Sequence, residues 1–581
     1  MKGHFVMKHF KRAAAMLLAV VLSLCLAVTA FAADTEQKTG SLTVTGSGLW
    51  VPAADATGAG TGKNVTAIRM FTARVTGDAA ADPVQKNEFD SYVLEEKWGD
   101  FFKQTDLFNK VKTAGGITDT AVTADTITKE ALSDAAVAYV KSLTNNETTN
   151  AGTLADFAHK AQNWARKNST TLSAKPSLVT VKAATQDAGE DKTKGTAAFN
   201  DLPAGYYLVF PDGGSTGDNS RGTDAILVNV PRNGGNTAVK IKSTFPTVDK
   251  KVQTTEGGNS TDNGTAQVGD TVTFKLTAKV PDMTDYDKYT FKFIDKLSDG
   301  LEFVADSVEV NIAKNKITAG ANTYSATYED TTKTLTVAFA DLKNVVKSGT
   351  SKVATDDEIV VTYKAKITKD AVKDNPAKNT VYLEYSNNPG TDGTGKSNPD
   401  ESKVYTYDID IFKFYKDGET EKELPNATFK LTASEKSDST AIKLVAEADG
   451  KTYHVADAKE LDDTSVTKVT EVTTGADGKI AIKGLKAGTY YLHETTAPTG
   501  YNKLKKPIKI DITVTGEAYT TPTYKVDEVD QNTSNIIKVE NVKGVMLPET
   551  GSVGTIGLTA LGVAVVLLGV FAPRKKKKEN Q

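Results

Sequence analysis

One lysine, one glutamate and one asparagine fall on apolar strand faces in the C-terminal third of the chain. Lys413 alternates in step with two isoleucines, Glu494 with a tyrosine and a leucine, and Asn541 with an isoleucine and a valine. Polar and ionic groups on such faces are costly to bury singly, so we expect the three to meet.

These three side chains could form a covalent bond with one another. Burial lowers the pKa of a lysine and raises that of a carboxyl group, so a neutral amine and a neutral acid can coexist. The Lys413 amine could then attack the Asn541 carboxamide while Glu494 moves the protons, which releases ammonia and leaves an isopeptide bond. The alternative is a buried Lys413–Glu494 ion pair with Asn541 capping a turn.

The motifs around this set resemble the Cna B-type domains of Gram-positive pilins and adhesins, in which such a bond forms spontaneously. The resemblance rests on the pattern Y-x-L-x-E-T-x-A-P-x-G-Y at residues 490–501, on LPNATF at 424–429 and on VEN at 539–541. It implies that Glu494 is the catalytic proton shuttle. Asn426 stands where the family usually has glycine, a departure that affects a turn and not the three reacting residues.

A second set upstream resembles the pilin isopeptide domain that uses aspartate. Lys250 shares a strand face with two valines, Asp295 follows an apolar strand, and Asn379 shares a face with apolar residues. The resemblance implies a Lys250–Asn379 cross-link with Asp295 as the proton shuttle. Lys251 and Asn387 remain alternatives, and so does an ordinary solvated lysine pair.

The chain ends with a pentapeptide, an apolar run and a basic cluster, in that order. The pentapeptide consists of Leu547, Pro548, Glu549, Thr550 and Gly551. The run at 553–572 carries no charge and is long enough to cross a bilayer as a helix, and the cluster at 574–578 favours the cytoplasmic side. This order resembles a cell-wall sorting signal, which implies that a sortase cleaves after the threonine and transfers its acyl group to an amine. A plain membrane anchor is the alternative.

The acceptor amine is predicted from the same resemblance. In backbone pilins the first domain ends with an exposed lysine, often in a Y-P-K motif, that accepts the threonine of the next subunit. This chain lacks the Tyr-Pro pair and offers VKIKSTFP at 239–246. We choose Lys242 and keep Lys240 as the alternative, because lysines on strand edges are common without any chemical role.

The elements that must position these residues indicate a mainly β protein. We expect tandem immunoglobulin-like (Cna-type) β-sandwich domains in an elongated rod, the first with a helical insertion of two to four short helices between 87 and 168, including apolar residues around Tyr92 and Val93. The predicted segments are a signal peptide at 1–32, domains at 33–246, 247–400 and 401–543, and the sorting signal at 544–581.

The N-terminus supports export, and the composition excludes several classes of function. Basic residues, an apolar core and an A-x-A site predict a mature start at Ala33, which removes Cys25, the only cysteine, and with it any disulfide. A net charge of -3 gives no argument for nucleic acid. His159, His454 and His493 lack metal-ligand spacing, so we expect no metal, no cofactor and no turnover enzyme.

The sequence therefore predicts a structural protein, the backbone subunit of a sortase-assembled pilus on the cell wall. Its expected partners are sortase, further copies of itself and peptidoglycan, with minor pilins and host matrix as further candidates. The alternative is a wall-anchored adhesin or minor pilin that binds host matrix and does not polymerise. A secreted enzyme with β-sandwich accessory domains is a third interpretation, for which the sequence shows no catalytic cluster.

Overall fold

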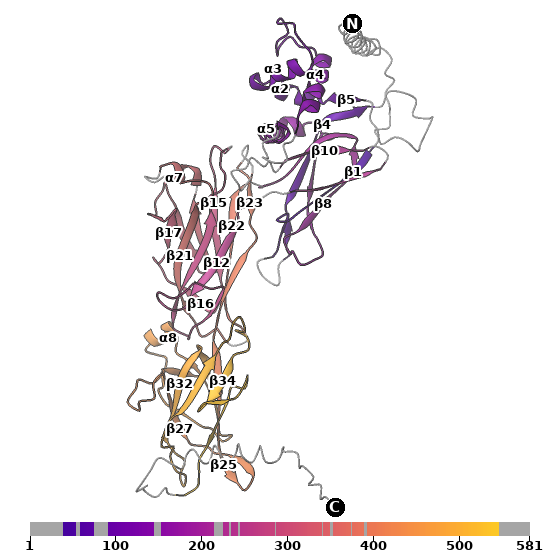
Figure 1. The fold of residues 1–581 in the computed structure, drawn as a ribbon. Coiled ribbons are helices and arrows are strands. Elements are labelled where there is room, and N and C mark those ends of the chain that lie inside the picture. Colours follow the sequence, from indigo (N-terminus) through magenta and orange to yellow (C-terminus); the bar gives the residue numbers. More distant parts are fainter. Residues whose placement is uncertain are drawn as a thin grey trace, which may run out of the picture. The chain divides into compact units, whose positions relative to one another are not determined.

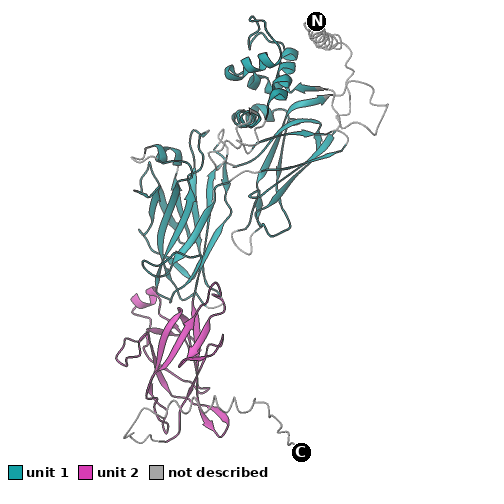
Figure 2. Cartoon of the chain, in the orientation of Figure 1, with its two compact units in different colours: residues 1–405 teal, residues 406–581 magenta. Residues whose placement is uncertain are grey.

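The fold is known from a computed structural model (Figure 1). It describes residues 39–53, 59–74, 91–144, 153–213, 225–231, 234–241, 245–284, 286–339, 341–348, 353–372, 375–387 and 392–544. The chain divides into two compact units, residues 1–405 and 406–581 (Figure 2). The predicted class, mainly β with tandem sandwiches, is confirmed.

The first part of unit 1 contains two facing sheets and a short hairpin. The first sheet has the order β11 (Asn236–Lys240), β1 (Thr39–Gly46), β8 (Gly195–Pro203), β7 (Thr185–Gln186). The second has the order β10 (Ile226–Val230), β9 (Gly205–Pro211), β4 (Asn64–Arg74), β5 (Ser91–Leu94), with β6 (Val179–Ala183) also on β4; the hairpin is β2 (Trp50–Val51) with β3 (Thr61–Gly62). Strict alternation in β1 buries Leu42 and Val44 between the sheets.

The predicted helical insertion is present in this part of the chain. It consists of η1 (Glu96–Trp98), α2 (Gly99–Phe102), α3 (Thr105–Ala114), α4 (Lys129–Ser142), α5 (Thr153–Lys167) and α6 (Ser169–Ser173). Aromatic side chains at helical spacing form its core, with the Trp98 and Trp164 ring centroids 5.2 Å apart. Our assignment of Tyr92 and Val93 to a helix is wrong. They lie in β5, because pairing with β4 decides the conformation of a short apolar run that periodicity alone leaves ambiguous.

The second part of unit 1 is a sandwich of two larger sheets. One has the order β12 (Val248–Gln253), β14 (Thr271–Lys279), β21 (Glu358–Ile367), β17 (Glu309–Ile312), β18 (Asn315–Ile317), with β16 (Leu301–Phe303) also on β21. The other has the order β13 (Asn263–Thr265), β24 (Asp400–Tyr405), β22 (Ala377–Ser386), β15 (Phe291–Leu297), β20 (Thr334–Phe339), β19 (Ser325–Glu329), with β23 (Thr394–Lys396) on β22; α7 (Leu342–Ser348) lies outside both.

Unit 2 is also a two-sheet sandwich. One sheet has the order β26 (Thr420–Glu423), β25 (Tyr407–Asp417), β31 (Lys479–Leu485), β29 (Thr452–Val455), β28 (Leu444–Ala446), with β36 (Ile536–Glu540) on β25. The other has the order β30 (Val472–Thr473), β27 (Thr428–Thr432), β32 (Gly488–Thr496), β33 (Ile508–Thr513), β34 (Thr523–Val526), β35 (Val529–Asp530); α8 (Ala458–Asp462) is its one short helix within the described residues.

Several predictions concern residues outside the described ranges. These are the signal peptide at 1–32, the pentapeptide at 547–551, the apolar run at 553–572 and Lys242. In the part of the chain that the structure does describe, no helix is both long and apolar enough to span a bilayer. The predicted domain limits stay predictions, although β24, which ends at residue 405, pairs with β22 and so belongs to unit 1.

Candidate isopeptide sites

The first candidate site lies between the two sheets of unit 2. Lys413 comes from β25 and Asn541 directly follows β36, which pairs with β25 in parallel. Glu494 comes from β32 in the facing sheet, where it pairs with Phe429 of β27. Each side chain points inward because the strands alternate buried and exposed residues, and Lys413, Glu494 and Asn541 are 0%, 5% and 2% exposed. The structure thus brings the three predicted residues together.

The contacts within this site match what an amide-forming reaction needs. Lys413 Nζ donates to Asn541 Oδ1 and lies 3.3 Å from Glu494 Oε1. Asn541 Nδ2 donates to the same Glu494 Oε1 at 2.8 Å, so one carboxylate oxygen touches both the nucleophile and the nitrogen that would leave. The backbone N–H of Leu504 holds the other oxygen, Oε2, at 2.7 Å.

Burial also adjusts the chemistry of the lysine. Removal from water lowers the pKa of Lys413 to about 8, against the opposing charge of Glu494. The Phe429 ring, 5.8 Å from Nζ, closes the site from the apolar side. A substantial fraction of the amine is therefore neutral near pH 8, which is the form that attacks a carbonyl carbon.

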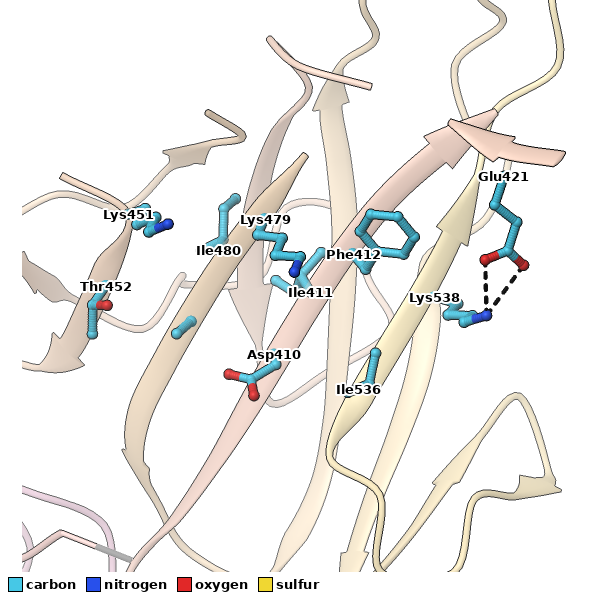
Figure 3. Close-up of a pocket in the computed structure, with 11 residues that line it drawn as sticks. Asp410, Ile411, Phe412, Glu421, Lys451, Thr452, Lys479, Ile480, Ile536 and Lys538 are labelled. Carbon is cyan, nitrogen blue, oxygen red and sulfur yellow. Dashed lines mark hydrogen bonds and ion pairs between the residues drawn. The ribbon is translucent and has the colours of Figure 1, made fainter. Parts of the chain in front are cut away.

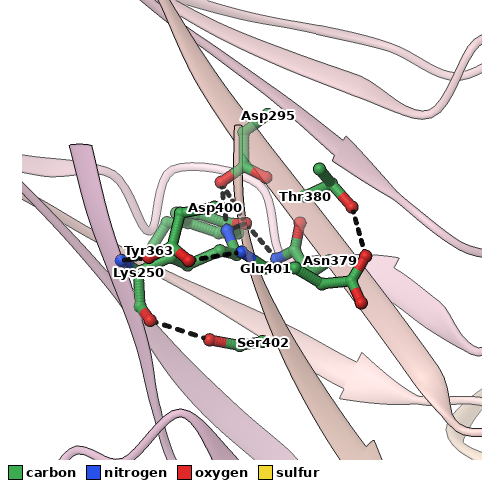
Figure 4. A network of polar contacts seen from close by, with 8 residues as sticks. All are labelled: Lys250, Asp295, Tyr363, Asn379, Thr380, Asp400, Glu401 and Ser402. Carbon is green, nitrogen blue, oxygen red and sulfur yellow. Dashed lines mark hydrogen bonds and ion pairs between the residues drawn. The ribbon is translucent and has the colours of Figure 1, made fainter. Parts of the chain in front are cut away.

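The second candidate site lies between the sheets of the second sandwich of unit 1 (Figure 4). Lys250 is on β12, Asp295 on β15 and Asn379 on β22, and all three are 0% exposed. Lys250 Nζ forms a 2.6 Å ion pair with Asp295 Oδ2. Asp295 and Asn379 lie on adjacent strands, in which Asp295 pairs with Val381, two residues past the asparagine. The structure again brings the predicted set together.

The two alternatives for this site lie elsewhere. Lys251 points to the surface, where it pairs with Asp249 and Asp262, and its side chain is 31% exposed. The Asn387 amide donates to the Thr394 carbonyl oxygen at 3.0 Å on the outside of the sandwich. Neither contacts Lys250, which the alternation of β12 turns inward.

Electrostatics in this site favour the neutral forms of lysine and acid. Burial lowers the pKa of Lys250 against the attraction of Asp295, and burial raises the pKa of Asp295 against the attraction of Lys250. Asp295 Oδ1 and Asn379 Oδ1 are both buried and have no hydrogen-bond partner among the described residues. Unpaired buried oxygens are rare and costly in folded proteins.

One member of the second site, Tyr363, was not predicted from the sequence. Tyr363, on β21, is 0% exposed and donates its hydroxyl proton to Asp295 Oδ2 at 2.7 Å. The hydroxyl also accepts from Asn379 Nδ2 at 2.5 Å and from Lys250 Nζ at 3.4 Å. A signal was available, because a tyrosine on the apolar face of a strand needs a buried partner for its hydroxyl.

The first part of unit 1 contains a buried ionic group of a different kind. Glu95 accepts from Arg69 Nε at 2.8 Å and forms a 2.6 Å ion pair with Lys175. No asparagine joins these contacts among the described residues, so the cluster is an ion-pair network and not a third lysine–acid–amide set. Lys240, the alternative acceptor, is exposed at the end of β11.

A shallow pocket on unit 2 is separate from the candidate sites (Figure 3). It lies over the outer face of β25, β31 and β36, and its lining includes Phe412, Ile536 and the ion pair of Lys538 with Glu421, 2.8 Å apart. Lys413 and Asn541 do not line it, because they point to the opposite face. The described residues also hold no cluster of three or more His, Cys, Asp or Glu suited to a metal ion.

Two family models match the chain. The SpaA prealbumin-like fold domain matches residues 410–528, and the LPXTG cell wall anchor motif matches residues 540–581. The second match makes the chain a cell-wall-anchored surface protein. No curated protein matches the sequence.

Solved structures of major pilins are similar at low sequence identity. A backbone pilin of Streptococcus pyogenes is 14% identical over 89% of this chain and 95% of its own, with a TM-score of 0.39. The full-length major pilin SpaD of Corynebacterium diphtheriae is 18% identical over 88% and 100%, with a TM-score of 0.36. A C-terminal fragment of the major pilin GBS80 of Streptococcus agalactiae is 23% identical over 52% and 100%, with a TM-score of 0.38.

Proposed function

We propose that this chain, which carries a prealbumin-like SpaA domain and an LPXTG cell wall anchor motif, is the backbone subunit of a covalently polymerised cell-surface pilus. The observation that carries the proposal is the pair of fully buried lysine–acid–asparagine sets, one in each of two successive sandwiches. A protein without cysteine in its predicted mature part has no disulfides to stabilise it outside the cell, and internal isopeptide bonds supply that cross-link.

The reaction in unit 2 follows from the contacts. The neutral Lys413 amine adds to Cγ of Asn541, and Glu494 Oε1, within reach of both nitrogens, takes a proton from Nζ and delivers one to Nδ2. The Cγ–Nδ2 bond breaks, ammonia leaves and a Lys413–Asn541 amide remains. Glu494 ends in the protonation state in which it began, so the acid is a catalyst for a single turnover.

The same step in the second sandwich joins Lys250 to Asn379. Asp295 Oδ2 is 2.6 Å from the attacking nitrogen, as a proton acceptor must be. The amide product has no titratable nitrogen, so the buried site no longer holds an amine whose charged form burial disfavours. Formation of the amide is therefore thermodynamically favoured once the strands have paired.

Polymerisation would be a separate reaction, which uses the predicted sorting signal near the C-terminal end of the chain. A sortase would cleave between Thr550 and Gly551 and transfer the Thr550 acyl group to Lys242 of the next subunit, with peptidoglycan as the final acceptor. The anchor motif match over residues 540–581 supports the first half of this step. The acceptor lysine rests on the sequence alone.

Intact mass of the mature protein tests the proposal. We expect a mass below that of the sequence by two molecules of ammonia, with protease digestion yielding one peptide pair linked through Lys413 and Asn541 and another through Lys250 and Asn379. Asn541→Ala and Asn379→Ala should each restore one ammonia. A mass equal to that of the plain sequence would contradict the internal cross-links.

Polymerisation is tested separately on a denaturing gel of cell-wall extract. An extract without a covalent ladder would favour the non-polymerising adhesin.

A further inference from the structure

The Tyr363 hydroxyl connects the acid of the second site to the nitrogen that leaves. It is the only group among the described residues whose polar contacts include Asp295, Asn379 and Lys250 together, at 2.7, 2.5 and 3.4 Å. Asp295 Oδ2 has contacts with Lys250 and Tyr363 and none with the Asn379 amide. The acid therefore reaches the attacking nitrogen directly and the leaving nitrogen only through the tyrosine.

In the described part of unit 2, no hydroxyl bridges the acid and the amide in this way. There, Glu494 Oε1 itself touches both Lys413 Nζ and Asn541 Nδ2, while a backbone N–H holds Oε2. A glutamate carries one more methylene than an aspartate and reaches the amide unaided. With the shorter Asp295, a gap remains between acid and amide, and the phenol oxygen occupies it.

We infer that Tyr363 is a catalytic residue of the second site, which relays a proton from Asp295 to Nδ2 of Asn379 as the Lys250–Asn379 bond forms. The inference rests on the proposed function, because it assigns a role within that reaction. It distinguishes the two sites by mechanism: direct transfer by a glutamate in unit 2, and transfer through a phenol in the second sandwich of unit 1.

The relay balances in protons. Asp295 begins as the neutral acid and Lys250 as the neutral amine. As Nζ adds to Cγ of Asn379, the carbon becomes tetrahedral and Nδ2 gains a lone pair, so the two hydrogen bonds of the Tyr363 hydroxyl reverse their direction. Asp295 then passes its proton to the phenol oxygen, the phenol gives its own proton to Nδ2, and Asp295 takes a proton from Nζ. The Cγ–Nδ2 bond breaks, ammonia leaves, and both Asp295 and Tyr363 return to their starting states.

The surroundings of Tyr363 suit this role. Its ring stacks on Phe274 with centroids 5.5 Å apart and also contacts Phe303 at 5.9 Å, so packing fixes the ring and aims the hydroxyl. Burial and the neighbouring Asp295 raise the pKa of Tyr363 well above its ordinary value, so the hydroxyl keeps its proton until a partner supplies another. A protonated phenol whose ring is fixed between the two groups needs only a rotation of its O–H bond to transfer a proton from one to the other.

The test follows each cross-link in the full chain during cell-free synthesis. Samples are quenched at successive times and digested, and mass spectrometry measures the linked and unlinked forms of both peptide pairs. We expect Tyr363→Phe to slow the Lys250–Asn379 cross-link by roughly 10²-fold, the lower range for general acid–base catalysis, and to leave the Lys413–Asn541 cross-link of the same molecule unchanged. Tyr289→Phe, which removes another buried tyrosine hydroxyl of the same sandwich, is the matched control and should change neither.

A second variant separates relay from packing. p-Aminophenylalanine at position 363 keeps the ring and restores a polar N–H group at the same place, so we expect it to recover at least part of the rate lost in Tyr363→Phe. A Lys250–Asn379 cross-link that forms at the normal rate in Tyr363→Phe would overturn the relay. A Tyr363→Phe variant that forms the cross-link slowly and is not improved by p-aminophenylalanine would also overturn the relay. A Tyr363→Phe variant that does not fold would overturn it too, because the hydroxyl would then have a structural role. Absence of the cross-link in the unaltered chain would instead overturn the proposed function of this site.

Discussion

Burial turns Lys413 from a solvated cation into a candidate nucleophile. Its Nζ lies between the two sheets with a carboxylate, an amide and an aromatic ring as its neighbours. An isolated charge in such a place costs several kcal/mol, and pairing with Glu494 offsets only part of that cost. The lowered pKa of Lys413 shows that the cost of burial outweighs the attraction of Glu494, and it leads to a prediction about stability.

Asn541→Ala prevents the cross-link and leaves Lys413 free to titrate. The pKa of Lys413 is about 8 in the folded chain and near 10.5 in the unfolded chain, so between these values only the unfolded chain holds the proton. Folding then releases a proton, and the free energy of unfolding should rise by about 3 kcal/mol as the pH rises from 8 to 10.5. Below pH 8 both states are protonated and this contribution is constant.

The control for this prediction is the double variant Lys413→Met with Asn541→Ala. It lacks the titrating amine but keeps every other ionisable group of unit 2. Urea unfolding of both variants across the same pH range gives the difference that belongs to Lys413. Parallel pH curves for the two variants would contradict the lowered pKa.

At the scale of elements, strand register determines which residues meet. Parallel pairing of β25 with β36 sets Lys413 opposite Val539, which brings Asn541 beside the same pair of strands. A slip of one residue would turn Lys413 to solvent, because side chains alternate along a strand. The segment between β26 and β27 lies beside Lys413, because the Leu424 N–H donates to the Lys413 carbonyl oxygen at 2.9 Å, and Asn426 lies in this segment with a φ of 64°.

Asn426 therefore carries a testable backbone role. A left-handed conformation costs most L-residues roughly 1–2 kcal/mol, and asparagine and glycine tolerate it best. We expect Asn426→Ala to lower the free energy of unfolding of unit 2 by about 1 kcal/mol and Asn426→Gly to cause no loss. Denaturant unfolding of the two variants side by side measures the effect, and equal stability of the alanine and glycine variants would contradict it.

The same period of two explains why much of the site was predictable. Alternation along single strands assigned Lys413, Glu494 and Lys250 to inward faces, and it favoured Lys250 over Lys251, which remained an alternative until the structure turned it to the surface. Alternation along β21 also turns Tyr363 inward, but it cannot identify the partners of the hydroxyl, because these come from β12, β15 and β22. Only the packing of two sheets places a hydroxyl from β21 among them.

The helices and strands of the fold were predictable to a similar extent. Long alternating strands and helices with apolar residues at helical spacing lie where the sequence indicates, as for α4 and α5. The run around Tyr92 was misassigned because four residues are too few to show a period. Helix α3 was missed although Leu107, Phe108 and Val111 have helical spacing and are buried in the insertion core.

At the scale of the whole molecule, the proposal requires an amine on one subunit for the threonine of another. Lys242→Ala should abolish the high-molecular-weight ladder that a denaturing gel of cell-wall extract reveals, because a covalent polymer does not separate in detergent. Lys240→Ala is the matched control, since that lysine is two residues away in the sequence and is exposed at the end of β11, and it should leave the ladder intact. A ladder that persists when both lysines are changed would place the acceptor elsewhere.

The position of the Lys413–Asn541 pair also bears on how unit 2 would respond to pulling. Lys413 lies on β25, the first strand of the unit, and Asn541 directly follows β36, the last strand among the described residues, and these two strands run in parallel side by side. Once an amide joins them, tension that enters at the C-terminal end of the chain passes from residue 541 directly to residue 413 through covalent bonds. The polypeptide between them, with both sheets and the apolar core, lies outside that path and bears no force.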